Sequence, residues 1–384
     1  MNNPKFLERI LEIYKFSSAD RLKNDYLLSE HWREYYENQY SKFSKSENVL
    51  NFRNKQLLSL GCDDSDRYAS FLDLYSFIND WKLDQDFLVK NLSKLNVGNN
   101  DTAHKFLGFY LDYAELVHIK LFSHMNSKIK KNINLICEIG GGFGSLGRIL
   151  INNLNCKYIL IDLPEANLIS SYFLKSHFPD KKFYLYDSLK NQNDTLRKID
   201  EKCIEENDIF ILPPWTLVSF SEKIKINFFV NTYSFMEMRQ NIIKNYFDFI
   251  HKHSESGSYF LNINRYQKDT SGDSIKFSEY PYDDDWDCLI SERSPIRHNM
   301  HFMLTERKQL DFNKNIKPEL KKLQGEEKKS YRSKEYLEFA NIPLLGGIEK
   351  LVRKIFRKLL IKMFGIKFLN KIGKKLYNIN SKNK

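Results

Sequence analysis

The chain has 384 residues, of which 42% are hydrophobic, 14% aromatic and 28% charged; this excludes general disorder and fibrous repeats and allows a large buried core. The net charge of +11 resides in residues 345–384, which hold 12 of the 60 Lys and Arg residues but one of the 49 acidic residues. The rest of the chain is neutral and has no basic stripe with interleaved aromatics, so nucleic acid is not an expected partner. Five scattered cysteines, no signal-peptide pattern and no apolar window of spanning length favour a cytoplasmic protein.

Residues 1–130 are predicted to form a helical N-terminal domain. Apolar residues recur there at helical spacing, as in Phe6, Ile10 and Tyr14, and again over 106–121. From 131 to 306, short apolar runs alternate with amphipathic segments, a pattern typical of βα units around a mainly parallel sheet. Strands are expected at 135–139, 158–162, 183–186, 209–212, 227–231 and 259–263, followed by a hairpin of 287–292 and 300–305.

The fold class is therefore α/β, with a Rossmann-like sheet after the helical domain. Residues 307–345 are polar and Lys-rich, which indicates a surface segment or linker. Residues 346–384 are predicted to form a basic amphipathic helical tail, with apolar and cationic side chains on opposite faces. We expect 348–375 to attach to an anionic membrane surface on the inner face of the membrane, because each basic residue there contributes about 1 kcal/mol. Docking on the protein body, docking on a dimer partner and nucleic-acid binding are the alternatives for this tail.

A glycine-rich loop follows the first predicted strand. Glu138 ends that strand, and the loop glycines Gly140, Gly141, Gly142 and Gly144 lead directly into an amphipathic helix. Glycines allow a sharp turn and a close approach of a ligand to the backbone. Asp162, followed by Leu163, ends the next strand 22 residues after Gly140, where an acid can accept hydrogen bonds from a ribose. The pattern predicts a nucleotide-type site.

Glu138 favours one cofactor over another. A dinucleotide places its pyrophosphate on the helix N-terminus, and a carboxylate directly before the glycines would repel it. S-adenosylmethionine has no phosphate and carries an ammonium and a sulfonium cation, so an acid suits it. We therefore expect S-adenosylmethionine; a nicotinamide or flavin nucleotide and a turn without a ligand remain the alternatives.

At these residues the chain resembles the bacterial sugar O-methyltransferases, a family of class I S-adenosylmethionine-dependent enzymes. The likeness lies in residues 138–144, 158–165, 231–238 and 264–266, and in Asn51-Phe52-Arg53 of the helical region. It implies that Glu138 and the loop glycines hold the methionine part of S-adenosylmethionine and that Asp162 holds the ribose. It also implies methyl transfer to a hydroxyl of a free, nucleotide-linked or lipid-linked sugar in surface polysaccharide (capsule or O-antigen) biosynthesis. Methylation of a small aromatic or other metabolite, and a non-catalytic membrane-tethered scaffold, are the alternatives.

A sugar hydroxyl is a poor nucleophile, so a base is expected to assist methyl transfer. Glu237 follows the 227–231 strand by a short loop and is the leading candidate for a base or a substrate ligand; alternatively it is an acid favoured by a helix N-terminus. His301 and His298, at the start of the last strand, are the other candidate bases.

The candidate substrate-binding residues lie after two strands. Asn264 and Arg265 follow one strand, while Tyr282, Asp285 and Trp286 belong to a run that joins aromatic faces to acids, as sugar sites do. A plain acidic turn, or metal binding by the run of aspartates, would also explain this run, and a divalent metal has no other support in the sequence.

The adenine site has two candidate positions. Asp187 and Ser188 follow the 183–186 strand, and Pro213-Pro214-Trp215 follow the 209–212 strand. Either pair suits the adenine, depending on which strand lies third in the nucleotide half of the sheet.

Overall fold

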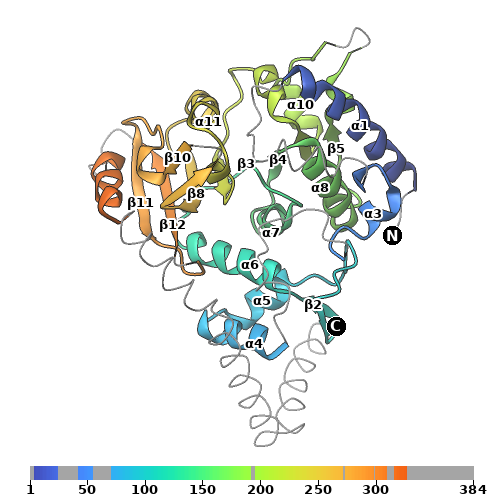
Figure 1. The fold of residues 1–384 in the computed structure, drawn as a ribbon, viewed down its shortest axis with the longest axis horizontal. Helices are drawn as coiled ribbons and strands as arrows, with labels where there is room; N and C mark the ends of the chain where they lie inside the picture. The colour runs from blue at the N-terminus through green and yellow to red at the C-terminus, as the bar shows by residue number, and fades with distance from the viewer. Residues whose placement is uncertain are drawn as a thin grey trace, which may run out of the picture.

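An eight-stranded mixed sheet forms the centre of the protein in a computed structural model (Figure 1). The strand order is β11-β12-β8-β7-β3-β4-β6-β5, with β12 antiparallel to both neighbours and the remaining pairs parallel. The strands are β3 (Leu135–Ile139), β4 (Lys157–Ile161), β5 (Phe183–Leu185), β6 (Ile209–Leu212), β7 (Phe228–Thr232), β8 (Tyr259–Arg265), β11 (Trp286–Arg293) and β12 (Met300–Arg307). The structure describes residues 4–24, 42–54, 71–191, 195–270, 273–297, 299–308 and 315–326.

All eight strands of this sheet were predicted, because central strands covered on both faces are continuous apolar runs. The α/β class is confirmed. Successive side chains of each strand enter two separate cores. In β3, for example, Ile136 faces one core, while Cys137 and Ile139 face the other.

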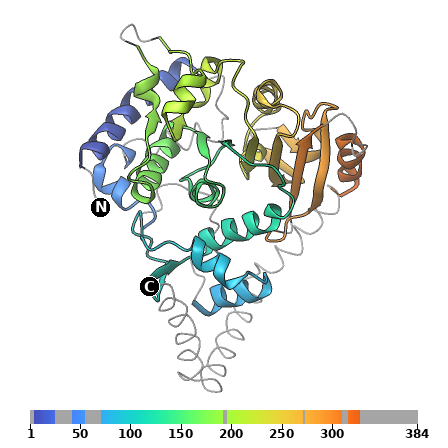
Figure 2. The ribbon, with the colours of Figure 1, turned by 180° about the vertical axis from the view of Figure 1, so that it is seen from behind.

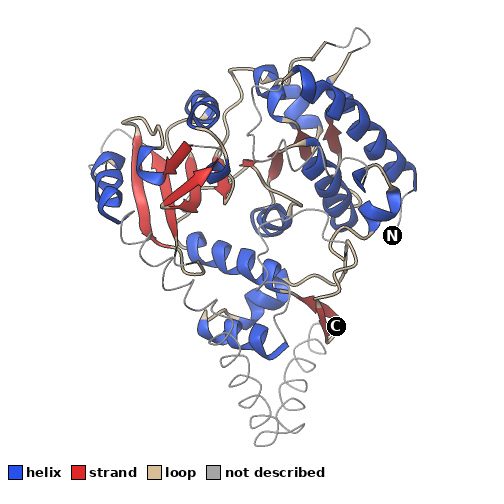
Figure 3. Cartoon of the chain, in the orientation of Figure 1, coloured by secondary structure: helices blue, strands red, loops and turns tan. Residues whose placement is uncertain are grey.

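Helices cover both faces of the sheet (Figure 2, Figure 3). One core contains side chains of α1 (Pro4–Lys23), α6 (Tyr113–Asn126), α7 (Ser145–Leu154) and α8 (Pro164–His177). The other contains side chains of η3 (Pro214–Ser219) and α11 (Gln240–His253). The shorter elements are α3 (Ser46–Leu50), α4 (Phe71–Asp80), α5 (Gln85–Asn91), α9 (Tyr186–Leu189), α10 (Glu201–Glu206), η4 (Phe235–Glu237), η5 (Phe277–Glu279) and the hairpin β9 (Gln267–Thr270)–β10 (Asp273–Lys276).

The N-terminal region is helical as predicted over α1 and α3 to α6, with one correction. Residues 104–111 form a hairpin of β1 (His104–Phe106) and β2 (Phe109–Leu111). Leu107 and Gly108 turn the chain with φ of 49° and 85°, the left-handed pair that a two-residue hairpin turn requires. The prediction of a helix there was wrong, because a short hairpin with an apolar face imitates helical spacing.

The segment after β12 is more ordered than a polar linker. Residues 316–326 form a helix, and its side chains Ile316, Leu320 and Leu323 are buried in the core that contains α11. Residues 327–345 and the tail 346–384 lie outside the described residues. Within the ranges that are described, no helix is both long enough and apolar enough to cross a membrane.

Candidate cofactor and acceptor site

The glycine loop lies at the carboxyl edge of the sheet and touches the loop that follows β7. Gly140 has a φ of +72°, and a Cβ there would lie 2.0 Å from Oγ of Ser234. Gly144, with a φ of +87°, begins α7. Gly140, Gly141 and Gly142 are half-buried, so their backbone is accessible to a ligand. A side chain at Gly140 or Gly141 would collide with its neighbours in the loop.

Asp162 joins the glycine loop to the end of β4. Its Oδ2 accepts a hydrogen bond from the Gly142 N–H at 2.8 Å, and its Oδ1 accepts one from the Leu163 N–H at 2.7 Å. Burial raises the pKa of Asp162 to about 7, although these two hydrogen bonds oppose the shift. A half-buried carboxylate beside half-buried loop glycines is an arrangement that suits a ribose diol.

Glu138 supports the glycine loop from beneath. The side chain is 1% exposed, and its carboxylate accepts a hydrogen bond from the hydroxyl of Tyr158. Burial raises the pKa of Glu138 to about 7, with the Tyr158 hydrogen bond acting in the opposite direction. A Cβ on Gly141 would lie 2.9 Å from Cδ of Glu138, so the loop packs directly on this side chain. Glu138 is therefore shielded from solvent and positions the loop that packs on it.

Two buried asparagines hold the loop after β7. Asn231 donates to the Ile139 carbonyl at 2.8 Å and accepts from the Phe235 N–H at 3.1 Å. Asn264 accepts from the Met236 N–H at 3.1 Å and donates to Asn231 Oδ1 at 2.8 Å. Asn264 is fully buried, so the expectation that it binds substrate is corrected: it positions the loop.

Glu237 ends η4 within this same loop. Its Oε1 lies 3.1 Å from Nζ of Lys268 on β9, and both side chains are about 20% exposed. The Glu237 charge contributes to the raised pKa of Asp162, which places the two carboxylates at one edge of the sheet. Arg265, the last residue of β8, lies at this edge opposite Met300.

His301 is enclosed at the start of β12. It is 2% exposed; its Nε2 lies 3.1 Å from Oγ of Ser291 and its Nδ1 lies 3.3 Å from the hydroxyl of Tyr266. Burial lowers the pKa of His301 to about 4. A neutral, doubly hydrogen-bonded ring away from the surface does not serve as the expected base. His298 lies outside the described residues.

The aromatic and acidic run before β11 lies at the amino edge of the sheet, whereas the glycine loop lies at the carboxyl edge. Trp286 pairs with Arg307, and Glu306 pairs with Tyr259, the first residue of β8, whereas the glycine loop follows the last residue of β3. Tyr282 and Trp286 are buried among Phe247 and Phe260, and Asp285 lies 3.4 Å from Arg307. The expectation that Tyr282, Asp285 and Trp286 bind substrate is therefore corrected, because β11 starts at the same amino edge as β8.

The strand order decides between the two adenine candidates. Strand β6 lies between β4 and β5, and the Asp162 N–H donates to the Leu212 carbonyl at 3.2 Å. Asp187 and Ser188, after β5, instead accept hydrogen bonds from Arg9 of α1, at 2.6 and 2.8 Å for Asp187 and 3.2 Å for Ser188. Their predicted cofactor contact is corrected, and Pro213-Pro214-Trp215 are the residues next to Asp162.

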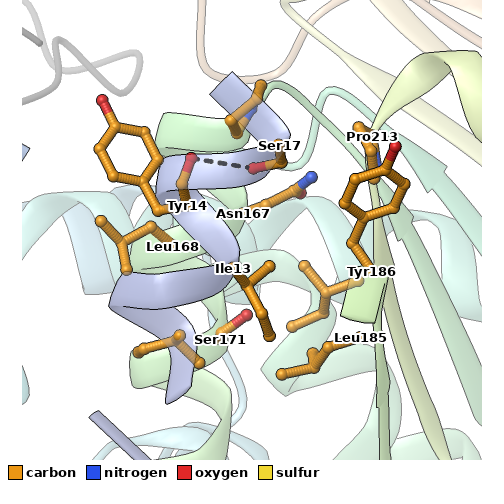
Figure 4. A pocket seen from close by; sticks show the side chains of 12 residues that line it. Ile13, Tyr14, Ser17, Asn167, Leu168, Ser171, Leu185, Tyr186 and Pro213 are labelled. Atoms are coloured by element: carbon orange, nitrogen blue, oxygen red, sulfur yellow. Dashed lines mark hydrogen bonds between the residues drawn. The ribbon is translucent and has the colours of Figure 1, made fainter. Parts of the chain in front are cut away.

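A small pocket lies beside Pro213, beneath α1. Figure 4 shows Ile13, Tyr14 and Ser17 of α1 facing Asn167, Leu168 and Ser171 of α8, with Leu185, Tyr186 and Pro213 on the sheet side. The N-terminal helix thus covers the nucleotide half of the sheet. A buried ion pair fixes it there, since Arg21 Nη1 lies 2.6 Å from Oε1 of Glu165.

The helical region also reaches the glycine loop itself. The Arg53 guanidinium lies over the ring of Phe143, with Cζ 5.0 Å from the centroid, and pairs with Asp112 at 2.9 Å. Of the residues near the site, Lys268, His118, Tyr233 and Arg297 were not selected from the sequence. Lys268, His118 and Arg297 lie outside the stretches that carry the resemblance, and Tyr233 lies within residues 231–238 without having been selected as a site residue.

Comparison with known proteins assigns the chain to no family. No protein-family model matches the chain, and no curated protein matches it by sequence. Among solved structures, the mitomycin 7-O-methyltransferase MmcR is 11% identical with a TM-score of 0.32, over 51% of this chain and 57% of that one. S-adenosylmethionine-bound CalS10, an amino pentose methyltransferase from Micromonospora echinaspora, is 6% identical with a TM-score of 0.33, over 50% of this chain and 92% of that one. At such TM-scores these likenesses carry no argument about fold, cofactor or substrate.

The donor set at the site suits S-adenosylmethionine better than a dinucleotide. Glu138 and Asp162 bring two carboxyl groups to the loop, where a pyrophosphate would be repelled and a sulfonium or ammonium would be stabilised. Three or more His, Cys, Asp or Glu side chains do not gather into a metal site anywhere in the described ranges.

Proposed function

We propose that this protein is an S-adenosylmethionine-dependent O-methyltransferase that acts on a hydroxyl group of a sugar. The observation that carries the proposal is the half-buried Asp162 carboxylate, hydrogen-bonded to the glycine loop at the edge of the sheet where Glu237 also lies. Asp162 and the backbone of 140–142 would hold the ribose and the methionine part of the cofactor.

S-adenosylmethionine, when bound, supplies a methyl group on a sulfonium sulfur. Transfer forms an oxygen–methyl bond, breaks the sulfur–methyl bond, leaves a neutral thioether and releases the hydroxyl proton. Glu237 is the residue that we assign to accept this proton. Lys268, whose Nζ lies 3.1 Å from Oε1 of Glu237, orients this side chain.

A sugar acceptor is supported by the resemblance over residues 231–238. That stretch contains Glu237 and forms the loop held by Asn231 and Asn264, so the most specific part of the likeness lies at the proposed acceptor edge. The acidic run 283–285 does not support a sugar acceptor, because it lies at the amino edge of the sheet and not at the edge that holds Glu237. Synthesis of surface polysaccharide is the setting that the resemblance suggests.

The test is methyl transfer from radiolabelled S-adenosylmethionine to a panel of sugars, nucleotide-sugars and catechol. We expect a sugar to be labelled, and Glu237→Gln to lower kcat by about 10²- to 10⁴-fold with unchanged cofactor affinity. Glu279→Gln, which removes an exposed carboxylate nearby, is the matched control. Labelling of catechol alone, or full activity of Glu237→Gln, would contradict the proposal.

The basic tail adds a second part to the proposal, namely peripheral attachment to an anionic membrane. Co-sedimentation with vesicles of anionic and of neutral lipid tests it, using the full chain and a chain that ends at residue 344. Equal sedimentation of the two chains would refute attachment through the tail.

A further inference from the structure

Three buried polar side chains form a chain of hydrogen bonds from helix α1 to the segment that follows β6. The Trp215 Nε1–H donates to the Tyr186 hydroxyl at 2.9 Å, and this hydroxyl donates to Oδ2 of Asp20, also at 2.9 Å. Asp20 lies on α1, Tyr186 begins α9 directly after β5, and Trp215 lies in η3. Their exposed fractions are 7%, 3% and 5%, so the chain is shielded from water along its length.

The chemistry of the three groups fixes the direction of this chain. An indole N–H only donates a hydrogen bond and a carboxylate only accepts, whereas a phenol hydroxyl does both. Tyr186 is therefore the necessary link between Trp215 and Asp20. A phenylalanine in its place would take one hydrogen-bond partner away from a buried N–H and one from a buried carboxylate.

Asp20 is held as a carboxylate at the α1 end of the chain. Nζ of Lys190 lies 2.5 Å from its Oδ2, and Nζ of Lys23 lies 3.2 Å from its Oδ1. Desolvation raises the pKa of Asp20, but the hydrogen bonds that it accepts from these two lysines and from Tyr186 outweigh this effect, so its pKa is lowered overall. Hydrogen bonds to an ionised acceptor are roughly twice as strong as neutral ones, so the Tyr186 hydroxyl is firmly oriented.

Aromatic packing also holds Tyr186 in place. Phe16 of α1 stacks on its ring with a centroid separation of 5.6 Å and an interplanar angle of 26°, and Trp215 meets the ring edge-on at 6.0 Å. Figure 4 shows Tyr186 and Pro213 on the sheet side, facing α1. The position of α1 therefore determines where Tyr186 lies and, through it, where Trp215 lies.

Trp215 belongs to the segment that borders Asp162. The Leu212 carbonyl at the end of β6 accepts the hydrogen bond from the Asp162 N–H at 3.2 Å. The N–H and the hydroxyl of Thr216 both donate to the Pro213 carbonyl, at 3.0 and 2.7 Å, which makes 213–216 a tight turn. A displacement of Trp215 would therefore be passed to the end of β6, against which the Asp162 backbone rests.

We propose that Asp20 and Tyr186 are positioning residues for the cofactor site. Through Trp215 they hold the end of β6 against Asp162, so that helix α1 contributes to tight binding of S-adenosylmethionine. This inference rests on the proposed methyltransferase function and goes beyond it, because it gives a role in cofactor binding to residues that do not touch the cofactor.

Calorimetric titration of the full chain with S-adenosylhomocysteine tests the proposal, together with the indole N–H resonances of protein that carries isotope-labelled tryptophan. The variants are Tyr186→Phe, Asp20→Ala and Asp20→Asn. Tyr184→Phe is the matched control, since Tyr184 lies on β5 and its hydroxyl donates to the Ser188 carbonyl at 3.3 Å, outside the chain. Trp215→Phe identifies the Trp215 resonance among those of the four tryptophans.

We expect Tyr186→Phe and Asp20→Ala each to weaken S-adenosylhomocysteine binding by about five- to tenfold and to shift the Trp215 indole resonance. Asp20→Asn keeps an acceptor oxygen, so it should lose less affinity than Asp20→Ala, and Tyr184→Phe should match the wild type. Combining Tyr186→Phe with Asp20→Ala should cost no more than about the larger single loss, because both changes break one chain.

Three results would overturn the inference: wild-type affinity in folded Tyr186→Phe, an unmoved Trp215 resonance in Asp20→Ala, or additive losses in the double variant. If Asp20→Ala does not fold, Asp20→Asn replaces it in the same comparisons. Absence of S-adenosylhomocysteine binding by the wild type would instead contradict the proposed function.

Discussion

Asp162 and Gly142 form the hydrogen bond that links the two halves of the candidate cofactor site, from the glycine N–H to Oδ2 at 2.8 Å. One residue is at the end of β4 and the other is in the loop after β3, so the bond holds the loop against the neighbouring strand. The same carboxylate is the one expected to receive the ribose. We therefore expect its protonation state to change both the hydrogen bond to the loop and the affinity for the cofactor.

Cofactor affinity should depend on pH through Asp162. Its pKa is raised to about 7, so below pH 7 the carboxyl is protonated in the free protein, and a ligand that requires the carboxylate must release that proton. The affinity for S-adenosylhomocysteine should fall as the pH decreases from 8 to 6, approaching tenfold per unit below pH 7. Asp162→Asn should bind weakly and without this pH dependence. A flat profile for the wild type would contradict the assignment.

Removing the Asp187 carboxylate should leave cofactor binding unchanged. Asp187 is paired with Arg9 beyond β6, so Asp187→Asn should keep the affinity for S-adenosylhomocysteine within about twofold. The stability cost should be about 1 kcal/mol or less, since the Arg9 pair is partly exposed. A large loss of affinity with normal stability would show that the adenine site includes the residues after β5.

Stability of the cofactor-free protein should fall as the pH rises through Glu138. The folded state raises the pKa of this acid from 4.5 to about 7, so the folded state binds its proton more tightly than the unfolded chain. Its contribution is therefore greatest at low pH and is lost as the pH rises through 7, by about 3 kcal/mol in all.

Glu138→Gln should remove this dependence. Urea unfolding at pH 5, 6, 7 and 8 should show the variant gaining stability relative to the wild type as the pH rises, while Glu279→Gln follows the wild type. A constant difference between Glu138→Gln and the wild type would refute the account of Glu138.

Breaking the buried pair between α1 and α8 should be costly. Glu165 is fully buried and Arg21 is 11% exposed, so Arg21→Ala leaves an uncompensated carboxylate and should lower the free energy of unfolding by about 3–5 kcal/mol. Replacing both residues, as Arg21→Met with Glu165→Leu, should restore most of this loss. Lys23→Ala, which removes an exposed partner of Asp20, should cost less than about 1 kcal/mol. Equal losses for the single and double variants would show that packing, not charge, is responsible.

The sheet and the cofactor loop could be predicted from the sequence because their signals are local. Buried strands such as 135–139 and 209–212 are continuous apolar runs, and glycines at 140–144 mark a turn whatever surrounds them. Asp162 follows from its spacing after that loop. These features do not depend on which strands become neighbours.

The remaining features of the candidate site depend on the order of the strands in the sheet. Local sequence patterns do not encode that order. Because the crossover places β6 beside β4, the candidate adenine residues next to Asp162 are Pro213-Pro214-Trp215 and not Asp187. Strand β12 runs antiparallel to both β8 and β11, so β11 starts at the same edge as β8, and Asp285 and Trp286 therefore lie at the amino edge of the sheet. Arg297 and Tyr233 come from separate segments of the chain, so no single stretch of sequence predicts their contact.

The most direct test of the central claim is calorimetric titration of the purified chain with S-adenosylmethionine and, in parallel, with NADH, followed by the same titrations of Asp162→Ala. The account predicts micromolar binding of S-adenosylmethionine, no binding of NADH, and loss of S-adenosylmethionine binding in the variant. Binding of NADH, binding of neither ligand by the wild type, or full affinity of Asp162→Ala for S-adenosylmethionine would contradict it.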